Sequence, residues 1–398
     1  MDVRAIILIG APTEPYQASN GNGTSLAQLR NGRISGVPMA LLPFFGRSLV
    51  TRVAEQLIRA GVDHVAILST AEAPFAEQRT SLAAQTSWKN ESPENIWRSA
   101  EEEFAELAQG GAELVLVLRM GPYVEINLDH LLQFHIDQRS RVTQVWDSAG
   151  PMDLFVISSS RRNDAAHLFR TGLTRSRVTV REFHLSGYVN RLERPGDFRQ
   201  LALDSFNLKT AIEPGGKQIR PGIWIEDGAK IDRGARIVAP AYIGAHSRVR
   251  ASSLLTRGSA IEHHCLVDCG TAIDNSTVLP FSEVGPGLDL CNSVLGFRQV
   301  TSLKRDVTVE IEDPKLVRAI SQAATVRLVA QTAEMIAYLP KQIWRGLSGA
   351  RIPQAPSIAE TANVDMQHYD APRIGDRARE DSKVFDPDLA VVRRYGNQ

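Results

Sequence analysis

The segment Ile231-Asp-Arg-Gly-Ala-Arg-Ile237-Val-Ala-Pro-Ala-Tyr-Ile243 places an aliphatic residue at every sixth position, and the pattern extends in both directions. The full series is Ile219, Ile225, Ile231, Ile237, Ile243, Val249, Leu255, Ile261, Val267, Ile273 and Leu279. A small residue follows most of them four positions later: Ala229, Ala235, Ala241, Ser247, Ser253, Ser259, Cys265, Thr271 and Thr277. A triangular coil needs a branched residue inside each short strand and a small one near each corner.

Three such hexapeptides make one turn, so the repeat predicts a left-handed parallel β-helix over residues 217–300. An ordinary half-buried sheet alternates with period two and fixes no residue type at period six. The phase slips by one residue near Val284, and the pattern fades between Leu290 and Val294. We expect the coil to close there.

Length and composition narrow the classes of function. The chain has 398 residues, enough for two domains, with 45 basic and 45 acidic residues. Because the basic and acidic residues are equal in number, the chain has no net positive charge that would attract nucleic acid or an anionic membrane. The first apolar run, Ala5 to Ile9, is too short for a signal peptide, and no run is long enough to span a membrane. The sequence therefore predicts a soluble, cytoplasmic protein with neither nucleic acid nor membrane as a partner.

Three cysteines are an odd number clustered in one region, which is not a disulfide framework and fits a reducing compartment. A zinc site built from His263, His264, Cys265 and Cys269 is an alternative. We favour a packing role, because Cys265 occupies a small inward position of the repeat.

Residues 1–210 alternate apolar strands with amphipathic helices, which predicts a Rossmann-like α/β/α sandwich with a mainly parallel sheet. The expected strands are residues 5–9, 64–68, 114–118 and 154–157, and the expected helices are residues 48–60, 95–108 and 129–139. Ligands of such sheets bind at the carboxyl ends of the strands.

Several segments of this domain resemble, in order, those of nucleotide-sugar pyrophosphorylases, the sugar-1-phosphate nucleotidyltransferases, and are most similar to mannose-1-phosphate guanylyltransferases. The segments are Ala5-Ile-Ile-Leu-Ile-Gly10, Val37-Pro-Met-Ala-Leu-Leu-Pro-Phe-Phe-Gly46, Arg59-Ala-Gly-Val-Asp63, Leu128-Asp-His-Leu-Leu-Gln-Phe-His135, and Gly187-Tyr188 through Pro195-Gly-Asp197-Phe198. With the coil, the resemblance covers most of residues 1–300. It implies transfer of a nucleotide onto a sugar-1-phosphate with release of pyrophosphate, assisted by Mg²⁺.

The resemblance also implies a glycine-rich loop with an arginine, a lysine on the phosphates and two metal-binding aspartates. This chain departs from all four. The loop is matched by Gly21-Asn-Gly23-Thr24-Ser25-Leu26, with serine in place of arginine, and Met39 stands in place of the lysine. The first metal-binding aspartate is expected close to Arg119, but neither Arg119 nor its neighbours are aspartates. Arg191 occupies the expected position of the second aspartate.

Catalytic groups that act as a unit lose most activity when one is removed. We therefore expect a catalytically degenerate protein of nucleotide-sugar metabolism, a ligand-binding, regulatory or scaffold subunit, to which no catalytic residue or cofactor is assigned. The candidate ligand-binding residues are Gly10, Gly21, Gly23, Thr24, Ser25, Arg119 and Arg191. Arg119 and Arg191 are expected to converge in a cationic pocket. The expected partners are a nucleotide sugar or nucleoside triphosphate, and a homo-oligomer or an active relative.

Three alternatives remain open. An active, Mg²⁺-dependent nucleotidyltransferase would take its catalytic groups from other positions, such as Asp147 or Asp153. A hexapeptide-repeat acyltransferase would use a histidine as general base, for which His246 is the candidate. A structural role would make the coil an oligomerisation device.

Beyond the coil, Asp313-Pro314 is a typical helix start, and apolar residues spaced along one face predict a C-terminal helix over residues 313–346. Residues 348–398 are rich in Pro, Asp and Arg without periodicity, which predicts a disordered tail.

Overall fold

The computed structural model describes residues 1–12, 32–74, 84–159, 180–320 and 393–394. Residues Met1–Ile320 belong to one compact unit that contains both an α/β domain and the repeat region. The protein is thus a mixed α/β protein, and contacts between its two halves are formed within that unit.

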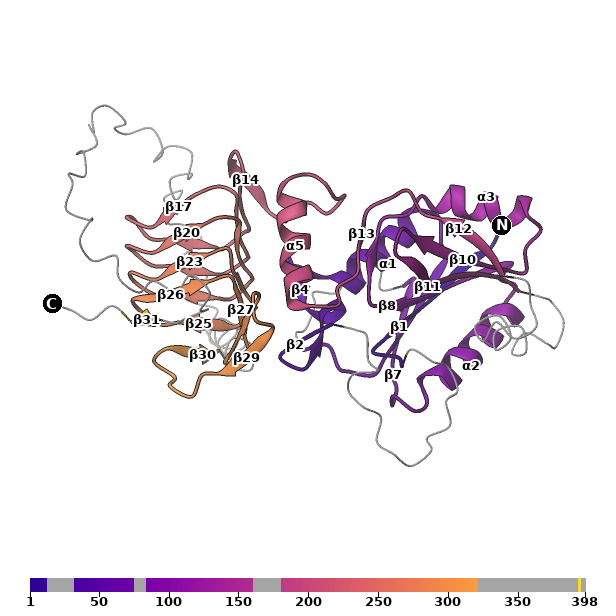
Figure 1. Ribbon diagram of the computed structural model, residues 1–398, viewed down its shortest axis with the longest axis horizontal. Helices are drawn as coiled ribbons and strands as arrows, with labels where there is room; N and C mark the ends of the chain where they lie inside the picture. Colours follow the sequence, from indigo (N-terminus) through magenta and orange to yellow (C-terminus); the bar gives the residue numbers. More distant parts are fainter. Residues whose placement is uncertain (13–31, 75–83, 160–179, 321–392, 395–398) are drawn as a thin grey trace, which may run out of the picture. The chain divides into compact units, whose positions relative to one another are not determined.

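The α/β domain is built on a mixed sheet, in which the described residues contribute seven strands in the order β12-β10-β11-β8-β1-β6-β7 (Figure 1). All neighbouring strands run parallel except β11, which is antiparallel to both β8 and β10. The strands are β1 (Val3–Ile9), β6 (His64–Ser69), β7 (Thr86–Asn90), β8 (Leu114–Met120), β10 (Val142–Asp147), β11 (Gly150–Ser158) and β12 (Val180–His184). The mainly parallel sheet expected from the sequence is confirmed.

Helices cover both faces of this sheet. Helices α1 (Leu49–Arg59) and α3 (Leu128–Asp137) pack with alternate strand residues such as Ile7 in one apolar core. Helix α2 (Ile96–Gln109) packs with the intervening residues, such as Ile6, in a second core. Successive residues of a strand point to opposite faces of the sheet, which explains why neighbouring residues belong to different cores. The three helices expected from the sequence are confirmed.

The repeat region is a stack of short parallel strands arranged in three sheets, which the chain visits in turn (Figure 1). Ile243, for example, pairs with Ile261, and Val249 pairs with Val267 in the next sheet. The stacked strands are β15 (Ile223–Ile225), β16 (Lys230–Ile231), β17 (Arg236–Ile237), β18 (Ala241–Ile243), β19 (Arg248–Val249), β20 (Leu254–Thr256), β21 (Ser259–Ile261), β22 (Leu266–Val267), β23 (Ala272–Asp274), β24 (Thr277–Val278), β25 (Ser282–Val284), β26 (Leu288–Cys291) and β27 (Ser293–Gly296). Their inward aliphatic side chains form a third core.

Small side chains at the corners satisfy the backbone of the next turn. The hydroxyl of Ser247 donates to the carbonyl of Glu262, at 2.6 Å, and that of Ser253 donates to the carbonyl of Asp268, at 2.8 Å. The thiol of Cys265 occupies an equivalent corner and contacts the carbonyl of Leu279 at 3.1 Å. Burial raises the pKa of this thiol to about 12, so Cys265 is a packing residue.

Both ends of the aliphatic series need correction. Ile219 is 59% exposed on β14 (Lys217–Arg220), which is antiparallel to β15 and lies outside the stack. At the other end Ile261 pairs with Val278, so the phase slips one repeat earlier than predicted. Val278 lies in the coil core, whereas Leu279 packs in the core of the α/β domain.

Antiparallel strands follow the last parallel turn. Strands β28 (Gln299–Ser302) and β29 (Val307–Glu310) extend the first sheet beyond β27, and β31 (Arg393–Arg394) pairs with β26. The prediction of a helix beginning at Asp313 is wrong, because β30 (Val317–Ala319) pairs with β25. Pairing with an open sheet edge overrides the local helix-start signal. Residues 321–346, and the tail 348–398 apart from β31, lie outside the described residues.

Helix α5 (Pro195–Phe206) precedes the coil and carries a buried arginine toward it. The Arg199 guanidinium donates to the side chains of Asn275 and Thr277, at 3.2 and 3.3 Å, and to the carbonyl of Gly258.

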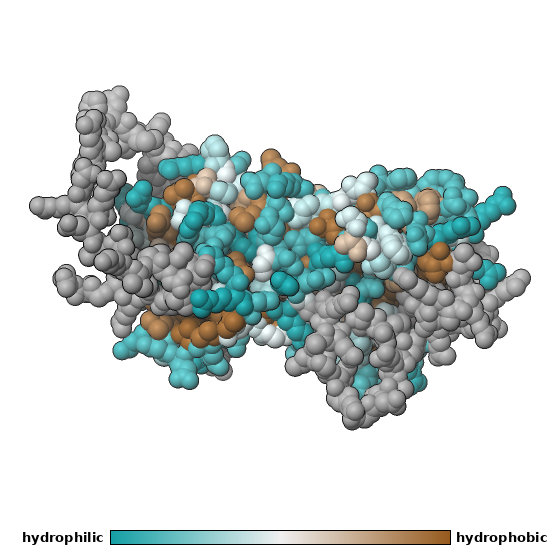
Figure 2. All heavy atoms as spheres, viewed as in Figure 1, coloured by the Kyte–Doolittle hydropathy of each residue, from teal (hydrophilic) through white to brown (hydrophobic). Residues whose placement is uncertain are grey.

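On the face shown in Figure 2, hydrophobic residues form scattered patches among hydrophilic ones. Among the described helices, none is long and apolar enough to cross a bilayer.

Candidate functional site

The candidate site lies at the edge of the sheet where the parallel strands end. Gly10 follows β1, Arg119 lies near the end of β8, and Asp147 is the last residue of β10. Because β11 runs in the opposite direction, its early residue Asp153 belongs to the same edge. Ligands of open α/β sheets bind at this edge.

Arg119 is buried, with only 6% of its surface exposed. Its guanidinium forms an ion pair with the carboxylate of Asp153 and donates to the carbonyl of Ala11, at 3.4 Å. A buried guanidinium needs such a counter-charge, because an unpaired buried charge is strongly destabilising. Arg119 therefore brings no net positive charge to the site.

Arg191 forms a second ion pair. It follows β13 (Val189–Asn190), which pairs with β9 (Tyr123–Val124). Its Nε and Nη2 lie 3.2 and 2.5 Å from the two oxygens of Asp147. Burial opposes ionisation of Asp147, but hydrogen bonds from Arg191 and from the backbone N–H of Ala149 outweigh it and hold the pKa of this carboxyl below its ordinary value.

The expected cationic pocket of Arg119 and Arg191 is not formed. By strand alternation Arg119 shares the α2 face of the sheet with Val117, while Asp147 shares the opposite face with Val145. The two arginines thus lie on opposite faces, each beside its own carboxylate. The sequence-based prediction missed this because it did not assign the register of the β10–β11 hairpin.

The candidate Gly10, and Met39 in place of the expected lysine, have structural roles. Gly10 adopts a φ of +73°, and a Cβ there would lie 2.1 Å from the Thr70 hydroxyl. Met39, at the lysine position of the resemblance, is 1% exposed in the 3₁₀ helix η2 (Met39–Leu41) and packs in the core. Gly21, Gly23, Thr24 and Ser25 lie outside the described residues.

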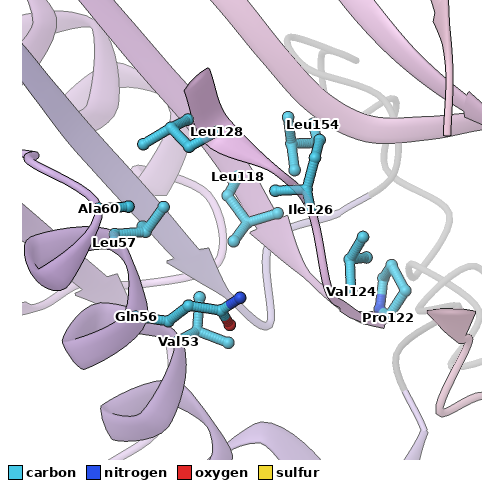
Figure 3. A pocket seen from close by; sticks show the side chains of 10 residues that line it. All are labelled: Val53, Gln56, Leu57, Ala60, Leu118, Pro122, Val124, Ile126, Leu128 and Leu154. Atoms are coloured by element: carbon cyan, nitrogen blue, oxygen red, sulfur yellow. The ribbon is translucent and has the colours of Figure 1, made fainter. Parts of the chain in front are cut away.

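A pocket opens on the α1 face beside the end of β8 (Figure 3). Gln56 is the one polar side chain among its lining residues, and α1 also contributes Val53 and Leu57. The other lining residues are Ala60, Leu118, Pro122, Val124, Ile126, Leu128 and Leu154. Such a lining excludes water but offers no counter-charge to a phosphate.

The three histidine rings of the coil lie close together along one corner. His246 and His264 have ring centroids 5.0 Å apart, and the His264 ring stacks on Phe281 at 4.9 Å. The Nδ1 atoms of His263 and His264 are 3.1 Å apart. Burial and neighbouring imidazoles lower the pKa of His263 to about 4, and they also lower the pKa of His264. Within the part of the chain that the structure describes, no group of three or more His, Cys, Asp and Glu side chains could hold a metal ion.

One buried acid escaped the sequence analysis. Glu262, directly after β21, is 1% exposed and accepts hydrogen bonds from the backbone of residues more than two hundred positions earlier in the chain. In the sequence, Glu262 is marked only as an acidic residue next to an inward position of the repeat. An acidic residue at such a position is equally typical of the exposed surface of the coil, so its burial could not be predicted.

Comparison with known proteins adds nothing to these observations: no protein-family model matches the chain, and no curated protein sequence matches it. A function must therefore be inferred from the residues and their geometry.

Proposed function

We propose that this protein is a catalytically degenerate relative of the sugar-1-phosphate nucleotidyltransferases, with a Rossmann-like domain and a left-handed β-helix, and that it acts as a ligand-binding or regulatory scaffold subunit. The mixed sheet, its helices on both faces and the stack of parallel strands that follows are compatible with this assignment. The sequence motifs quoted above provide the resemblance.

The observation that carries the proposal is the pairing of Arg119 with Asp153 and of Arg191 with Asp147. Arg191 stands at the position where the resemblance implies the second metal-binding aspartate, and Arg119 lies in the segment where the first one is expected. Mg²⁺ prefers hard oxygen ligands, and a guanidinium at the same place repels the ion and occupies the nearest carboxylate. The residues present therefore do not fit an Mg²⁺ site, and no catalytic step is derived through one.

The alternative, an active enzyme that uses Asp147 and Asp153, would require both carboxylates to leave their arginines. Asp147 has 9% of its side chain exposed, and its partner Arg191 has 36%. Separating this partly buried pair costs free energy, because each charge loses its hydrogen-bonded partner. We therefore favour the degenerate function.

The test is a pyrophosphate-release assay on the full chain with each nucleoside triphosphate and a panel of sugar-1-phosphates, with and without Mg²⁺. We expect no release above that of enzyme-free controls. Mg²⁺-dependent release that is abolished in Asp147→Asn or Asp153→Asn would overturn the proposal in favour of the active enzyme.

A thermal-shift screen of the same triphosphates and of nucleotide sugars tests ligand binding, because a ligand of the native state raises its apparent stability. A shift that persists in EDTA supports a binding subunit. If no compound shifts the melting temperature, ligand binding is excluded as the role of the protein and the scaffold role remains.

A further inference from the structure

The last turn of the coil ends in three parallel strands, β25, β26 and β27, one in each sheet (Figure 1). No further parallel turn follows them in the described residues, and each pairs instead with an antiparallel strand. β30 pairs with β25, β31 with β26 and β28 with β27. An open strand edge presents unpaired N–H and C=O groups that can bind a strand of another chain. Every sheet of the coil thus carries an antiparallel strand at this end.

The three antiparallel strands come from different parts of the chain. β28 follows β27 in a hairpin, and β30 lies shortly beyond that hairpin. β31 belongs to the C-terminal end of the chain, since residues 320–392 separate it from β30. The segment Ala390–Gln398 is nevertheless part of the same compact unit as the coil. The third sheet is therefore completed by a segment that is remote in sequence.

The same charge pattern occurs at the two edges that are not paired through a hairpin. In the second sheet Glu283 of β25 lies opposite Arg318 of β30, whose Nε donates to the Glu283 carboxylate at 2.9 Å. In the third sheet Asp289 of β26 lies opposite Arg393 of β31. Residues directly opposite each other in an antiparallel pair share a face of the sheet, and opposite charges there are stabilising. Charge and register therefore both favour a basic strand beside β26.

The two strands also suit each other in composition. Leu288 and Leu290 of β26 are 1% and 2% exposed and pack inside the coil, whereas Asp289 between them is only partly buried. The C-terminal segment Ala390-Val-Val-Arg-Arg394 places two β-branched residues, which favour strands, directly before two arginines. Backbone pairing at a sheet edge supplies affinity in strand addition, and the side chains supply specificity.

We propose that the edge of β26 is a strand-addition site for a basic extended segment, and that the C-terminal strand β31 is its occupant, a detachable strap that blocks this edge against other strands. The proposal rests on strand pairing at the end of the coil and is independent of the proposed function.

The strap is held by a short ladder and by its attachment to the same chain. β31 pairs with β26 over two residue positions only, so few hydrogen bonds are formed, and each makes a modest net contribution. A tethered segment meets its site at an effective concentration on the order of 1 mM. A strap bound about ten times more often than it is free then corresponds to a dissociation constant of about 0.1 mM for the same segment as a free peptide.

The experiment measures the fluorescence anisotropy of a labelled synthetic peptide of residues 388–398 with the full chain and with a chain that ends at Leu389. We expect saturable binding to the shortened chain, and binding at least about tenfold weaker to the full chain, whose site is occupied. Asp289→Arg in the shortened chain should weaken binding about three- to tenfold, and a peptide carrying Arg393→Asp should recover it. The matched control is Glu283→Arg, which reverses the corresponding charge of the second sheet and should leave the affinity unchanged.

Three outcomes overturn the proposal: no binding to the shortened chain at about 1 mM protein, equal affinity for the full and shortened chains, or equal effects of Asp289→Arg and Glu283→Arg. If the shortened chain does not fold, hydrogen–deuterium exchange of residues 288–291 in the full chain replaces the peptide assay. Asp289→Arg should lower the protection of these amides, and the double variant Asp289→Arg/Arg393→Asp should restore it. A double variant protected no better than the single one contradicts the strap.

Discussion

The guanidinium of Arg191 binds the carboxylate of Asp147 side-on, through two nitrogens and both oxygens. This bidentate arrangement ties the end of β10 to the segment after β13, two parts of the α/β domain that are not neighbours in its main sheet. The pair thus contributes to the structure of the strand edge at which a ligand would bind.

Replacing Asp147 with asparagine keeps the shape of the side chain and removes its charge. Because the pair is only partly exposed, we expect the free energy of unfolding at pH 7 to fall by about 1–2 kcal/mol. The pKa of Asp147 is depressed in the folded state, so this contribution is present above the ordinary aspartate pKa and is lost as the pH falls through the folded value.

Urea unfolding of the wild type and Asp147→Asn at pH 7 and pH 3 checks this, and the difference between them should shrink at pH 3. Asp227→Asn, at an exposed turn of the coil, is the control and should change little. A difference that grows in acid would contradict the assigned direction.

Ile261 and Ile219 belong to the same six-residue series but differ in burial, at 0% and 59% exposure. Ile261→Ala removes core methyl groups and should lower the free energy of unfolding by about 2–5 kcal/mol. Ile219→Ala should stay within about 0.5 kcal/mol of the wild type. Chemical denaturation of both variants measures the difference, and equal losses would place Ile219 inside the coil.

Much of the fold could be predicted because its signals are local and repeated. The strand Ala5 to Ile9 is a continuous aliphatic run buried on both faces, and the coil keeps its period over many turns. The position of the slip could not be predicted, because Val278 and Leu279 are both aliphatic and both fully buried. Only the packing shows that they face different cores.

The candidate site was harder to predict, since its contacts join distant segments. The sequence indicated Arg191 at the position of one expected aspartate and Arg119 in the segment that lacks the other, but not that each has an aspartate partner on one hairpin. In the same way, nothing local connects Phe45 with Glu262. Such pairings depend on how whole elements pack, which no short motif encodes.

Arg199 of α5 is 2% exposed, and its hydrogen bonds to the coil include a donation to the Gly258 carbonyl. Arg199→Met keeps much of the volume but leaves these acceptors unsatisfied, so we expect a loss of about 3 kcal/mol in the free energy of unfolding. Gln200→Met, at an exposed position of the same helix, is the control. If both variants unfold at the same urea concentration, the arginine contributes nothing to docking of the helix.

Gly46, in the turn Phe45–Gly46 at the coil junction, and Gly36, elsewhere in the α/β domain, provide a matched pair, since their φ values are +85° and +80°. An alanine in this left-handed region costs about 1–2 kcal/mol at either position. At Gly36 nothing lies within 4 Å of the added Cβ, whereas at Gly46 it would lie 2.7 Å from a Glu226 oxygen and 3.0 Å from the Tyr242 hydroxyl.

Neither neighbour can move freely. The other oxygen of Glu226 accepts from the Ala245 N–H at 3.0 Å, and Tyr242 is fully buried. We therefore expect Gly46→Ala to destabilise the protein roughly twice as much as Gly36→Ala, because the added methyl group must displace the turn from the coil. Thermal unfolding of the two variants measures this difference, and hydrogen exchange at Phe45 shows whether the turn has moved. Equal melting temperatures would mean that the turn does not press against the coil in solution.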